Sequence, residues 1–186
     1  GKVFDIGCGT GNFLAHAQKE GWEVAGIDFD HNAVIAAQQV FGLPNITQST
    51  LNEFADKYSS NLKKFNLITF FDVFEHIDNH NEFTETIKTL LASGGYIAMS
   101  MPYRKSAKWL QPNDLPPRHL TRWDRSSLSQ FFERHGFTVR YIKRVPASYT
   151  FILMKLRFMF GKRFSFGLVN KVNTTDKSNV MSKKNT

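Results

Sequence analysis

The segment from Val3 to Phe13 reads VFDIGCGTGNF, and it decides the fold. Its apolar beginning is typical of a buried strand, and Gly7, Gly9 and Gly11 allow the backbone to turn sharply and to approach a ligand closely. Residues 12–20 then carry apolar side chains at helical spacing. The backbone N–H groups at the start of that helix would point at the ligand. The segment therefore predicts a strand, a ligand-binding glycine loop and a helix.

Strand and helix patterns alternate along the rest of the chain. The expected strands are residues 2–6, 23–27, 45–48, 65–71, 96–101 and 137–144, and the expected helices are residues 12–20, 31–41, 52–58, 82–91 and 126–135. This alternation predicts a single α/β domain with a doubly wound, mostly parallel, Rossmann-like sheet and helices on both faces. Such sheets bind ligands at the carboxyl ends of their strands, near the point where the strand order reverses.

Two carboxylates flank the glycine loop and indicate the class of ligand. Asp28 ends the second strand, where it can accept hydrogen bonds from both hydroxyls of a ribose. Asp5 precedes the first glycine, and Asn12 occupies the last position of the dinucleotide fingerprint G-x-G-x-x-G, which is therefore incomplete. A carboxylate at Asp5 would repel a pyrophosphate but suits a cation. S-adenosylmethionine carries an ammonium, a sulfonium and a ribose without phosphate, so we expect it rather than NAD.

These motifs resemble the successive motifs of class I S-adenosylmethionine-dependent methyltransferases. The resemblance is carried by Asp5–Gly11, Gly26–Asp28, Phe65–Asp78 and Leu90–Gly95, and it spans about residues 1–144. It is closest to the small-molecule branch that includes ubiquinone-type O-methyltransferases and the methyltransferases of glycan and secondary-metabolite pathways. Residues 116–119 (PPRH) and Trp123 also resemble that branch.

The resemblance implies cofactor-binding roles for the glycine loop and its neighbours. Asp5 would act near the methionine amino group, and Asp28 would hold the ribose hydroxyls. The loop Gly7–Gly11, including Cys8, would line the methionine and the ribose with its backbone. Phe29 would lie against the adenine.

Two more residues are implied to contact the cofactor through their backbone. Leu51 would offer its N–H to the adenine ring, and Phe71 its carbonyl to the methionine ammonium. Many relatives have an acid after the third strand that holds the adenine amino group, but residues 49–52 read STLN here. Thr50 or Asn52 is the expected substitute.

His76 and His119 are the candidate general bases or substrate contacts. Methyl transfer depends mainly on the alignment of a deprotonated acceptor, to which a general base adds about 10²–10⁴-fold. His76 follows the fourth strand and His119 lies in the proline-rich loop 102–121, so both are expected at the carboxyl edge of the sheet. As alternatives, His76 caps the following loop or packs on the cofactor, and His119 anchors its own loop to backbone.

No metal ion is expected from the spacing of the acidic residues and histidines. Asp72, Glu75, His76 and Asp78 offer suitable ligand atoms, but no spacing among them demands a metal. Cys8 is the single cysteine, which excludes a disulfide framework and a multi-cysteine metal site. One cysteine fits a reducing compartment, and we expect a cytoplasmic protein.

Positive charge is concentrated in the last quarter of the chain. Residues 140–186 hold eleven Lys and Arg against Asp176 alone, whereas the 186-residue chain has 24 Lys and Arg against 16 Asp and Glu. A nucleic-acid enzyme more often has its basic surface beside the active site, so nucleic acid is not an expected substrate. Most of the 18 phenylalanines, such as Phe4, Phe65 and Phe70, fall at core positions of strands.

The chain divides into three expected parts: a methyltransferase domain (1–144), a basic amphipathic extension (145–169) and a disordered tail (170–186). Residues 148–163 combine apolar and basic side chains, which suits peripheral contact with an anionic membrane surface. As alternatives, this segment covers the sheet edge or forms a dimer contact. No apolar run is long enough to span a membrane. No signal peptide is visible, and a start at Gly1 rather than Met is expected of an excerpt from a longer chain.

The expected activity is transfer of the methyl group of S-adenosylmethionine to an oxygen or nitrogen of a small-molecule acceptor, with S-adenosylhomocysteine (SAH) as the product. Lipid-linked and sugar acceptors are the first candidates. Tyr103, Trp109 and Trp123, in or beside the long loop, are expected walls of the acceptor pocket. The alternatives are an RNA or protein methyltransferase that uses the basic tail, and a non-catalytic binding domain with the same fold. Residues 71–74 (FDVF) lack the Asn-Pro-Pro-Tyr type of signature of many base-methylating relatives.

Overall fold

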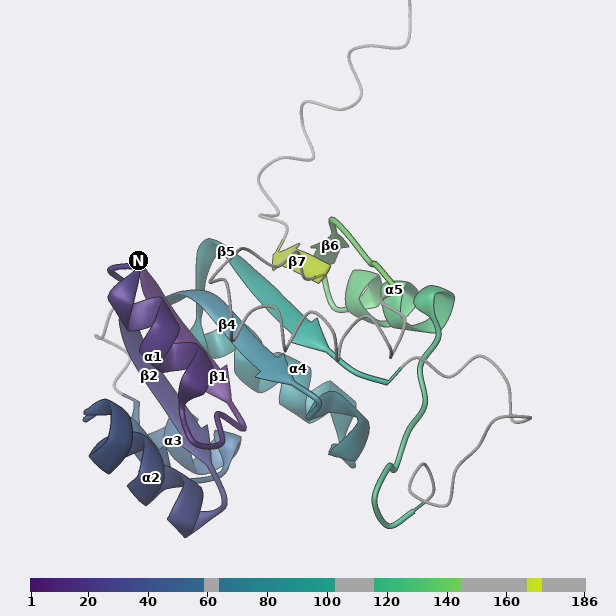
Figure 1. The fold of residues 1–186 in the computed structure, drawn as a ribbon. Coiled ribbons are helices and arrows are strands. Elements are labelled where there is room, and N and C mark those ends of the chain that lie inside the picture. The colour runs from purple at the N-terminus through teal and green to yellow at the C-terminus, as the bar shows by residue number, and fades with distance from the viewer. Residues whose placement is uncertain (59–63, 103–115, 145–166, 172–186) are drawn as a thin grey trace, which may run out of the picture.

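The computed structural model describes residues 1–58, 64–102, 116–144 and 167–171 (Figure 1). Its strands are β1 (Lys2–Ile6), β2 (Glu23–Asp28), β3 (Ile46–Gln48), β4 (Phe65–Phe71), β5 (Leu91–Ser100), β6 (Phe137–Val139) and β7 (Gly167–Lys171). Its helices are α1 (Asn12–Lys19), α2 (His31–Phe41), α3 (Leu51–Lys57), the 3₁₀ turn η1 (Phe74–His76), α4 (His80–Leu90) and α5 (Arg125–Arg134). No helix among these residues is both long and apolar enough to cross a membrane.

The strands form one sheet in the order β3-β2-β1-β4-β5-β7-β6. The strands β1 to β5 are parallel to their neighbours, and β7 runs antiparallel between β5 and β6. The chain builds outward from β1 to β3 and then returns to the other side of β1 with β4. The order therefore reverses between β1 and β4, which is where such a sheet leaves room for a ligand. The predicted doubly wound, mostly parallel sheet is confirmed.

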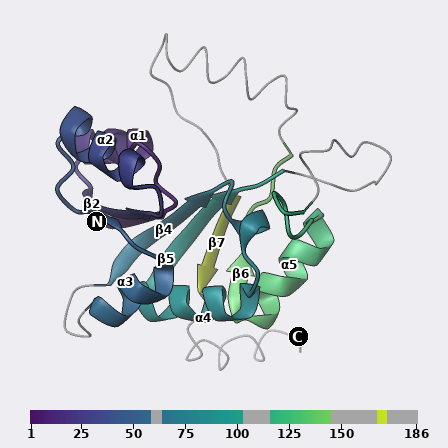
Figure 2. The ribbon, with the colours of Figure 1, turned by 90° about the horizontal axis from the view of Figure 1, so that it is seen from below.

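Helices cover both faces of the sheet. Figure 2 shows α1 and α2 on one face and α3, α4 and α5 on the other. The core under the second group is aromatic: the side chains of Phe4, Phe70 and Phe74 are completely buried, and the rings of Phe4 and Phe54 stack with their centroids 4.5 Å apart. Phe65 is 2% exposed. Phe4, Phe65 and Phe70 are therefore core residues, as predicted.

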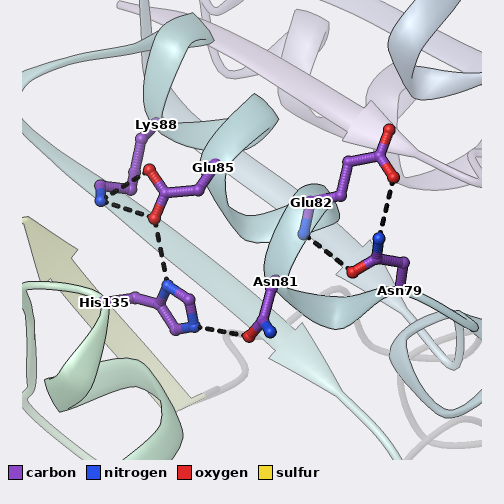
Figure 3. Close-up of polar contacts among 6 residues, drawn as sticks. All are labelled: Asn79, Asn81, Glu82, Glu85, Lys88 and His135. Atoms are coloured by element: carbon purple, nitrogen blue, oxygen red, sulfur yellow. Dashed lines mark hydrogen bonds and ion pairs between the residues drawn. The ribbon is translucent and has the colours of Figure 1, made fainter.

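Polar side chains define where several helices begin and how two of them meet. Asp124 accepts from the backbone N–H of Ser127 at the start of α5, as a helix cap does. At the other end of α5, His135 contacts Glu85 and Asn81 of α4 at 3.1 Å each, and Lys88 contacts the same Glu85 carboxylate at 2.8 Å (Figure 3). These contacts join the surfaces of α4 and α5.

The structure differs from the sequence expectations at three strands. The strand expected at 96–101 begins earlier, because β5 starts at Leu91. Its pairing with β4 jumps from Phe65↔Leu91 to Leu67↔Tyr96 and leaves the intervening residues out of register. The strand expected at 137–144 ends at Val139. The strand β7 was not predicted, and it crosses the expected boundary between extension and tail at residue 170. Its place in the sheet comes from pairing with both β5 and β6, which its short sequence GLVNK does not indicate by itself.

Candidate functional site at the β1–β4 edge

The glycine loop is tied to β2 and packed against the loop after β4. The backbone N–H groups of Gly7 and Cys8 both donate to the carbonyl of Ile27, at 2.8 and 3.0 Å. Gly7 has φ +70°, and a Cβ at this position would lie 2.6 Å from Cγ2 of Val73. Only glycine satisfies both the conformation and the space, so the end of β1 and the end of β4 can approach each other closely.

Gly9 and Gly11 have different surroundings although both have positive φ. A Cβ on Gly9 would meet nothing within 4 Å, so this peptide borders open space at the tip of the loop. A Cβ on Gly11 would lie 2.7 Å from Cδ1 of Leu43 and 2.9 Å from Cβ of Ala37. Gly11 therefore permits α1 to begin against α2. Of these two predicted cofactor-binding glycines, Gly9 has the surface that a ligand can occupy.

Asp28 holds the tip of the loop in place. Its Oδ2 accepts from the N–H of Gly9 at 2.7 Å, and its Oδ1 accepts from the N–H of Asp30 at 2.9 Å. A carboxylate has about four acceptor positions, so ribose hydroxyls can still donate to both oxygens. The neighbouring ring of Phe29 is 83% exposed, which is unusual for so large an apolar side chain and suits one wall of a base-binding site.

Asp5 is a buried carboxylate with a perturbed pKa. It is 3% exposed, and Oγ1 of Thr69 donates to its Oδ1 at 2.6 Å. Burial raises the pKa of Asp5 to about 7, with a further increase from the charge of Asp28, while the Thr69 hydrogen bond acts in the opposite direction. A cationic ligand beside Asp5 would restore the charged form. This is the electrostatic setting expected for a residue that binds an ammonium.

Cys8 belongs to the glycine loop, and its side chain is buried. Burial, with the charges of Asp5 and Asp28, raises the pKa of its thiol to about 12. The thiolate is the reactive form of cysteine, so this side chain is not a nucleophile at neutral pH.

The two proposed substitutes for the missing adenine-binding acid have other partners. Oγ1 of Thr50 accepts from the N–H of Glu53 in the capping box that begins α3. Nδ2 of Asn52 donates to Glu82 at 2.6 Å, and Oδ1 of Asn52 accepts from Thr86 at 3.1 Å. Both side chains support α3, so the expectation that one of them replaces the acid is not supported. Leu51, the first residue of α3, is 8% exposed.

The end of β4 contributes Phe71 and a strained neighbour. The ring of Phe71 packs edge-on against Phe13 of α1, with centroids 5.2 Å apart. Asp72 has φ +53°, rare for a residue other than glycine, and its N–H donates to the carbonyl of Ser100 at 2.9 Å. Such strain is often found at functional sites. From the sequence, Asp72 is a candidate only for metal binding, because backbone strain leaves no signal in a sequence.

The fold brings the two candidate histidines together. The ring centroids of His76 and His119 lie 5.0 Å apart, and Nδ1 of His76 donates to the carbonyl of Arg118. The carbonyl of Glu75 accepts from the N–H groups of Leu120 and Thr121, at 2.9 and 3.2 Å. Backbone contacts thus hold residues 118–121 along η1. His76 therefore contacts the loop of His119 through the carbonyl of Arg118, which none of its expected roles included.

Trp123 lies deeper than an exposed pocket wall would. Its Nε1 donates to Oγ1 of Thr121 at 3.0 Å, and its ring lies 5.3 Å from Phe74 and from Phe131. It therefore supports the loop that carries His119. Tyr103 and Trp109, the other expected pocket walls, lie outside the described residues, as do residues 145–166 of the basic extension.

Comparisons with known proteins agree with this fold. A family profile described as a methyltransferase domain matches residues 1–142. The ubiquinone biosynthesis O-methyltransferase of Glaesserella parasuis serovar 5 is 29% identical over 114 residues, which cover 59% of this chain and 48% of the relative. The protein of the same name from Photorhabdus laumondii subsp. laumondii is 26% identical over 113 residues, which cover 59% and 46%. The chain thus spans about half the length of the curated relatives that it matches.

Solved structures share the fold. A SAM-dependent methyltransferase from Archaeoglobus fulgidus has a TM-score of 0.64 at 19% identity, over 91% of this chain and 86% of that chain. The plantazolicin methyltransferase BpumL, crystallised with a pentazolic desmethylPZN analog and SAH, has a TM-score of 0.64 at 16% identity, over 92% and 77%. The fold is that of class I S-adenosylmethionine-dependent methyltransferases. The chain belongs to the methyltransferase domain family.

Proposed function

We propose that this chain binds S-adenosylmethionine at the β1–β4 edge and that the methyl group passes to an oxygen of a small-molecule acceptor, with nitrogen as the second choice. The observation that carries the proposal is the open space over Gly9 at the tip of the glycine loop. Asp28 accepts from the N–H of Gly9, and the strand before the loop contains the buried Asp5. The names of the curated relatives, which are O-methyltransferases, favour oxygen.

The residues of the chain have separate tasks in this reaction. Bound S-adenosylmethionine supplies an electrophilic methyl group on a sulfonium. Asp28 holds the ribose hydroxyls, and Asp5 pairs with the ammonium in a setting that a cation stabilises. His119 or His76 accepts the proton that the acceptor loses, at a ring nitrogen. Alignment of the acceptor oxygen with the methyl group contributes most of the rate.

Binding of SAH, with NAD as the comparison ligand, tests this proposal by calorimetry. Gly9→Ala and Gly21→Ala form a matched pair, because φ is positive at both positions and a Cβ meets nothing within 4 Å at either. Each substitution should cost about 1–2 kcal/mol of stability. Only Gly9→Ala should also weaken SAH binding, by at least tenfold, because its methyl group enters the space assigned to the ligand.

Three results would contradict the assignment. They are binding of NAD rather than SAH by the wild type, equal SAH affinity in Gly9→Ala and Gly21→Ala, and unchanged SAH affinity in Asp28→Ala. The last result would remove the ribose contact in particular.

The wider proposals concern the acceptor and the rest of the chain. A hydroxylated acceptor, lipid-linked or a sugar, is the substrate class to screen first once SAH binding is established. Peripheral membrane contact through residues 148–163, and the division into parts at residues 144 and 169, remain predictions. No described residue favours the RNA or protein substrates that were the alternative.

A further inference from the structure

Glu75, His76 and His119 place three metal-ligand atoms at one point of the carboxyl edge. A carboxylate oxygen of Glu75 and one ring nitrogen of each histidine all lie within 4.8 Å of one another. Glu75 and His76 belong to η1, whereas His119 lies 43 residues further along the chain than His76. Spacing along the sequence predicted no metal site, and only the fold brings the third residue to the other two.

Backbone hydrogen bonds fix the positions of these three residues. The carbonyl of Glu75 accepts from the N–H groups of Leu120 and Thr121, the two residues that follow His119. Thr121 is held in turn by Trp123, whose Nε1 donates to Oγ1 of Thr121. The two segments that supply ligand atoms are therefore joined to each other before any ion binds. Such preorganisation lowers the entropic cost of assembling a site.

The hydrogen bond of His76 selects the tautomer that a metal needs. A backbone carbonyl can only accept, so Nδ1 of His76 carries the proton that is donated to Arg118. The lone pair is then on Nε2. Metal-binding histidines commonly donate their second ring N–H to a carboxylate or a backbone carbonyl in this way, which orients the ring and strengthens the ligand.

The surroundings of Glu75 strengthen its attraction for a cation. Its side chain is 3% exposed, whereas His76 is exposed and His119 is partly buried. A carboxylate attracts a divalent cation more strongly in such a low-dielectric setting than in water. The exposed side of the cluster, at His76, gives an ion access from solvent.

We propose that Glu75, His76 and His119 bind one divalent transition-metal ion, with zinc as the reference ion. Two imidazoles and one carboxylate are a donor set of catalytic zinc sites, which keep a further position open for water or substrate. Imidazole nitrogen favours such ions over magnesium and calcium. Bonds of about 2.0–2.2 Å place tetrahedral ligand atoms about 3.4 Å apart, so atoms that now lie up to 4.8 Å apart must approach by up to about 1.4 Å. Rotation of the partly buried His119 provides this movement while His76 keeps its hydrogen bond to Arg118.

The role of the ion rests on the proposed function. Its open position lies beside the histidines assigned to the acceptor, and it suits a hydroxyl oxygen of that acceptor. Coordination would lower the pKa of the hydroxyl, and its proton would pass to water. With an ion bound, His76 and His119 are its ligands and no longer the proton acceptor. The oxygen would next form its bond to the methyl carbon as the carbon–sulfur bond breaks. The acceptor class is therefore a small molecule with an acidic or chelating hydroxyl group.

The test is metal binding by the full chain after treatment with a chelator. Zinc is titrated by calorimetry, and cobalt by its visible absorption, for the wild type, His119→Ala and His135→Ala. His135 is the matched control because it also lies beside a glutamate, at 3.1 Å from Glu85 (Figure 3). It follows the end of α5 and does not belong to the three-residue cluster. We expect one equivalent of zinc in the wild type and in His135→Ala, with an affinity at least tenfold lower in His119→Ala. Glu75→Gln should show the same loss of zinc affinity. If the substitution of the buried Glu75 prevents folding, His119→Ala alone decides the test.

The proposal fails if the wild type binds no zinc at micromolar concentration, if His119→Ala binds it as tightly as the wild type, or if His135→Ala loses it equally. SAH titration separates this failure from failure of the proposed function. Asp28→Ala should lose SAH and keep zinc, whereas His119→Ala should keep SAH and lose zinc. Zinc binding without SAH binding would leave the metal site standing and overturn the cofactor assignment.

Discussion

At the scale of single residues, the chemistry of the site depends on groups held in unfavourable states. Asp5 is a carboxylate enclosed by the sheet, and its pKa is raised to about 7 chiefly because burial disfavours its charge. Asp72 has a backbone conformation that costs free energy. Both features lower the stability of the protein when no ligand is bound. Both lie at the carboxyl ends of the adjacent strands β1 and β4, where the ligand is expected.

The raised pKa of Asp5 predicts pH-dependent cofactor affinity. The ionised form pairs with the ligand ammonium, so SAH should bind about tenfold more tightly at pH 8 than at pH 6. Calorimetry at the two pH values measures this ratio. In Asp5→Asn the affinity should be lower and should change little with pH. An unchanged ratio in that variant would show that another group titrates.

Ionisation of Asp5 strengthens cofactor binding but lowers the stability of the fold. The folded-state pKa of Asp5 lies above its ordinary value of 3.8, so the folded protein binds more protons between about pH 4 and pH 7. The contribution of Asp5 to stability is therefore fully present below pH 4 and is lost as the pH rises through 7. Urea unfolding of the wild type and Asp5→Asn across this range should show a difference that grows in favour of the variant.

At the scale of elements, hydrogen bonds and ion pairs join the surfaces of neighbouring helices. Glu85 of α4 is bound by Lys88 and by His135, the residue that ends α5 (Figure 3). The contact therefore joins α4 to the end of α5.

The pKa of Glu85 predicts a small loss of stability in acid. The hydrogen bond from Lys88, followed by that from His135, holds the pKa of this carboxyl below its usual range. Its contribution is present above the ordinary pKa of 4.5 and is lost as the pH falls through the lowered value. Because the carboxylate is more than half exposed, Glu85→Gln should cost no more than about 1 kcal/mol at pH 7.

Urea unfolding at pH 7 and pH 3 measures this effect. The cost of Glu85→Gln should vanish at pH 3, and the exposed Glu20→Gln should show no cost at either pH. A cost that persists at pH 3 would mean that packing, rather than charge, joins the two helices.

At the scale of the whole molecule, the sheet extends past the part that the resemblance covers. The strand β7 pairs with β5 through four residues and with β6 through three, and it is the only strand among the described residues that runs antiparallel to both of its neighbours. Without it, β6 would have no partner in the described sheet. The chain after residue 144 therefore contributes to the fold and is more than an extension.

Two truncations test the contribution of β7. A chain that ends at residue 144 should lose several kcal/mol of stability, because each backbone hydrogen bond of β7 contributes about 0.5–1.5 kcal/mol and the edges of β5 and β6 are left unpaired. A chain that ends at Lys171 should unfold at nearly the same temperature as the full chain. Equal stability of the two truncated chains would place the domain boundary at residue 144 after all.

The sequence by itself determined the class of fold and the position of the glycine loop, because the signals are local. The positive φ values of Gly7, Gly9 and Gly11, the alternation of strands and helices, and Asp28 at the end of β2 all follow from residues close together in the chain. The sequence could not distinguish Gly9, which borders open space, from Gly11, which packs on Ala37, because that difference depends on a helix 20 residues later.

Only the tertiary structure decided the rest. The meeting of Glu75 and His76 with His119, the burial that raises the pKa of Asp5, and the place of β7 between β5 and β6 all depend on contacts between distant segments. Periodicity records which face of an element is buried, and carries no information about which other element covers it. Pairing of strands and proximity of side chains arise when the whole sheet closes, so they are decided by the folded chain.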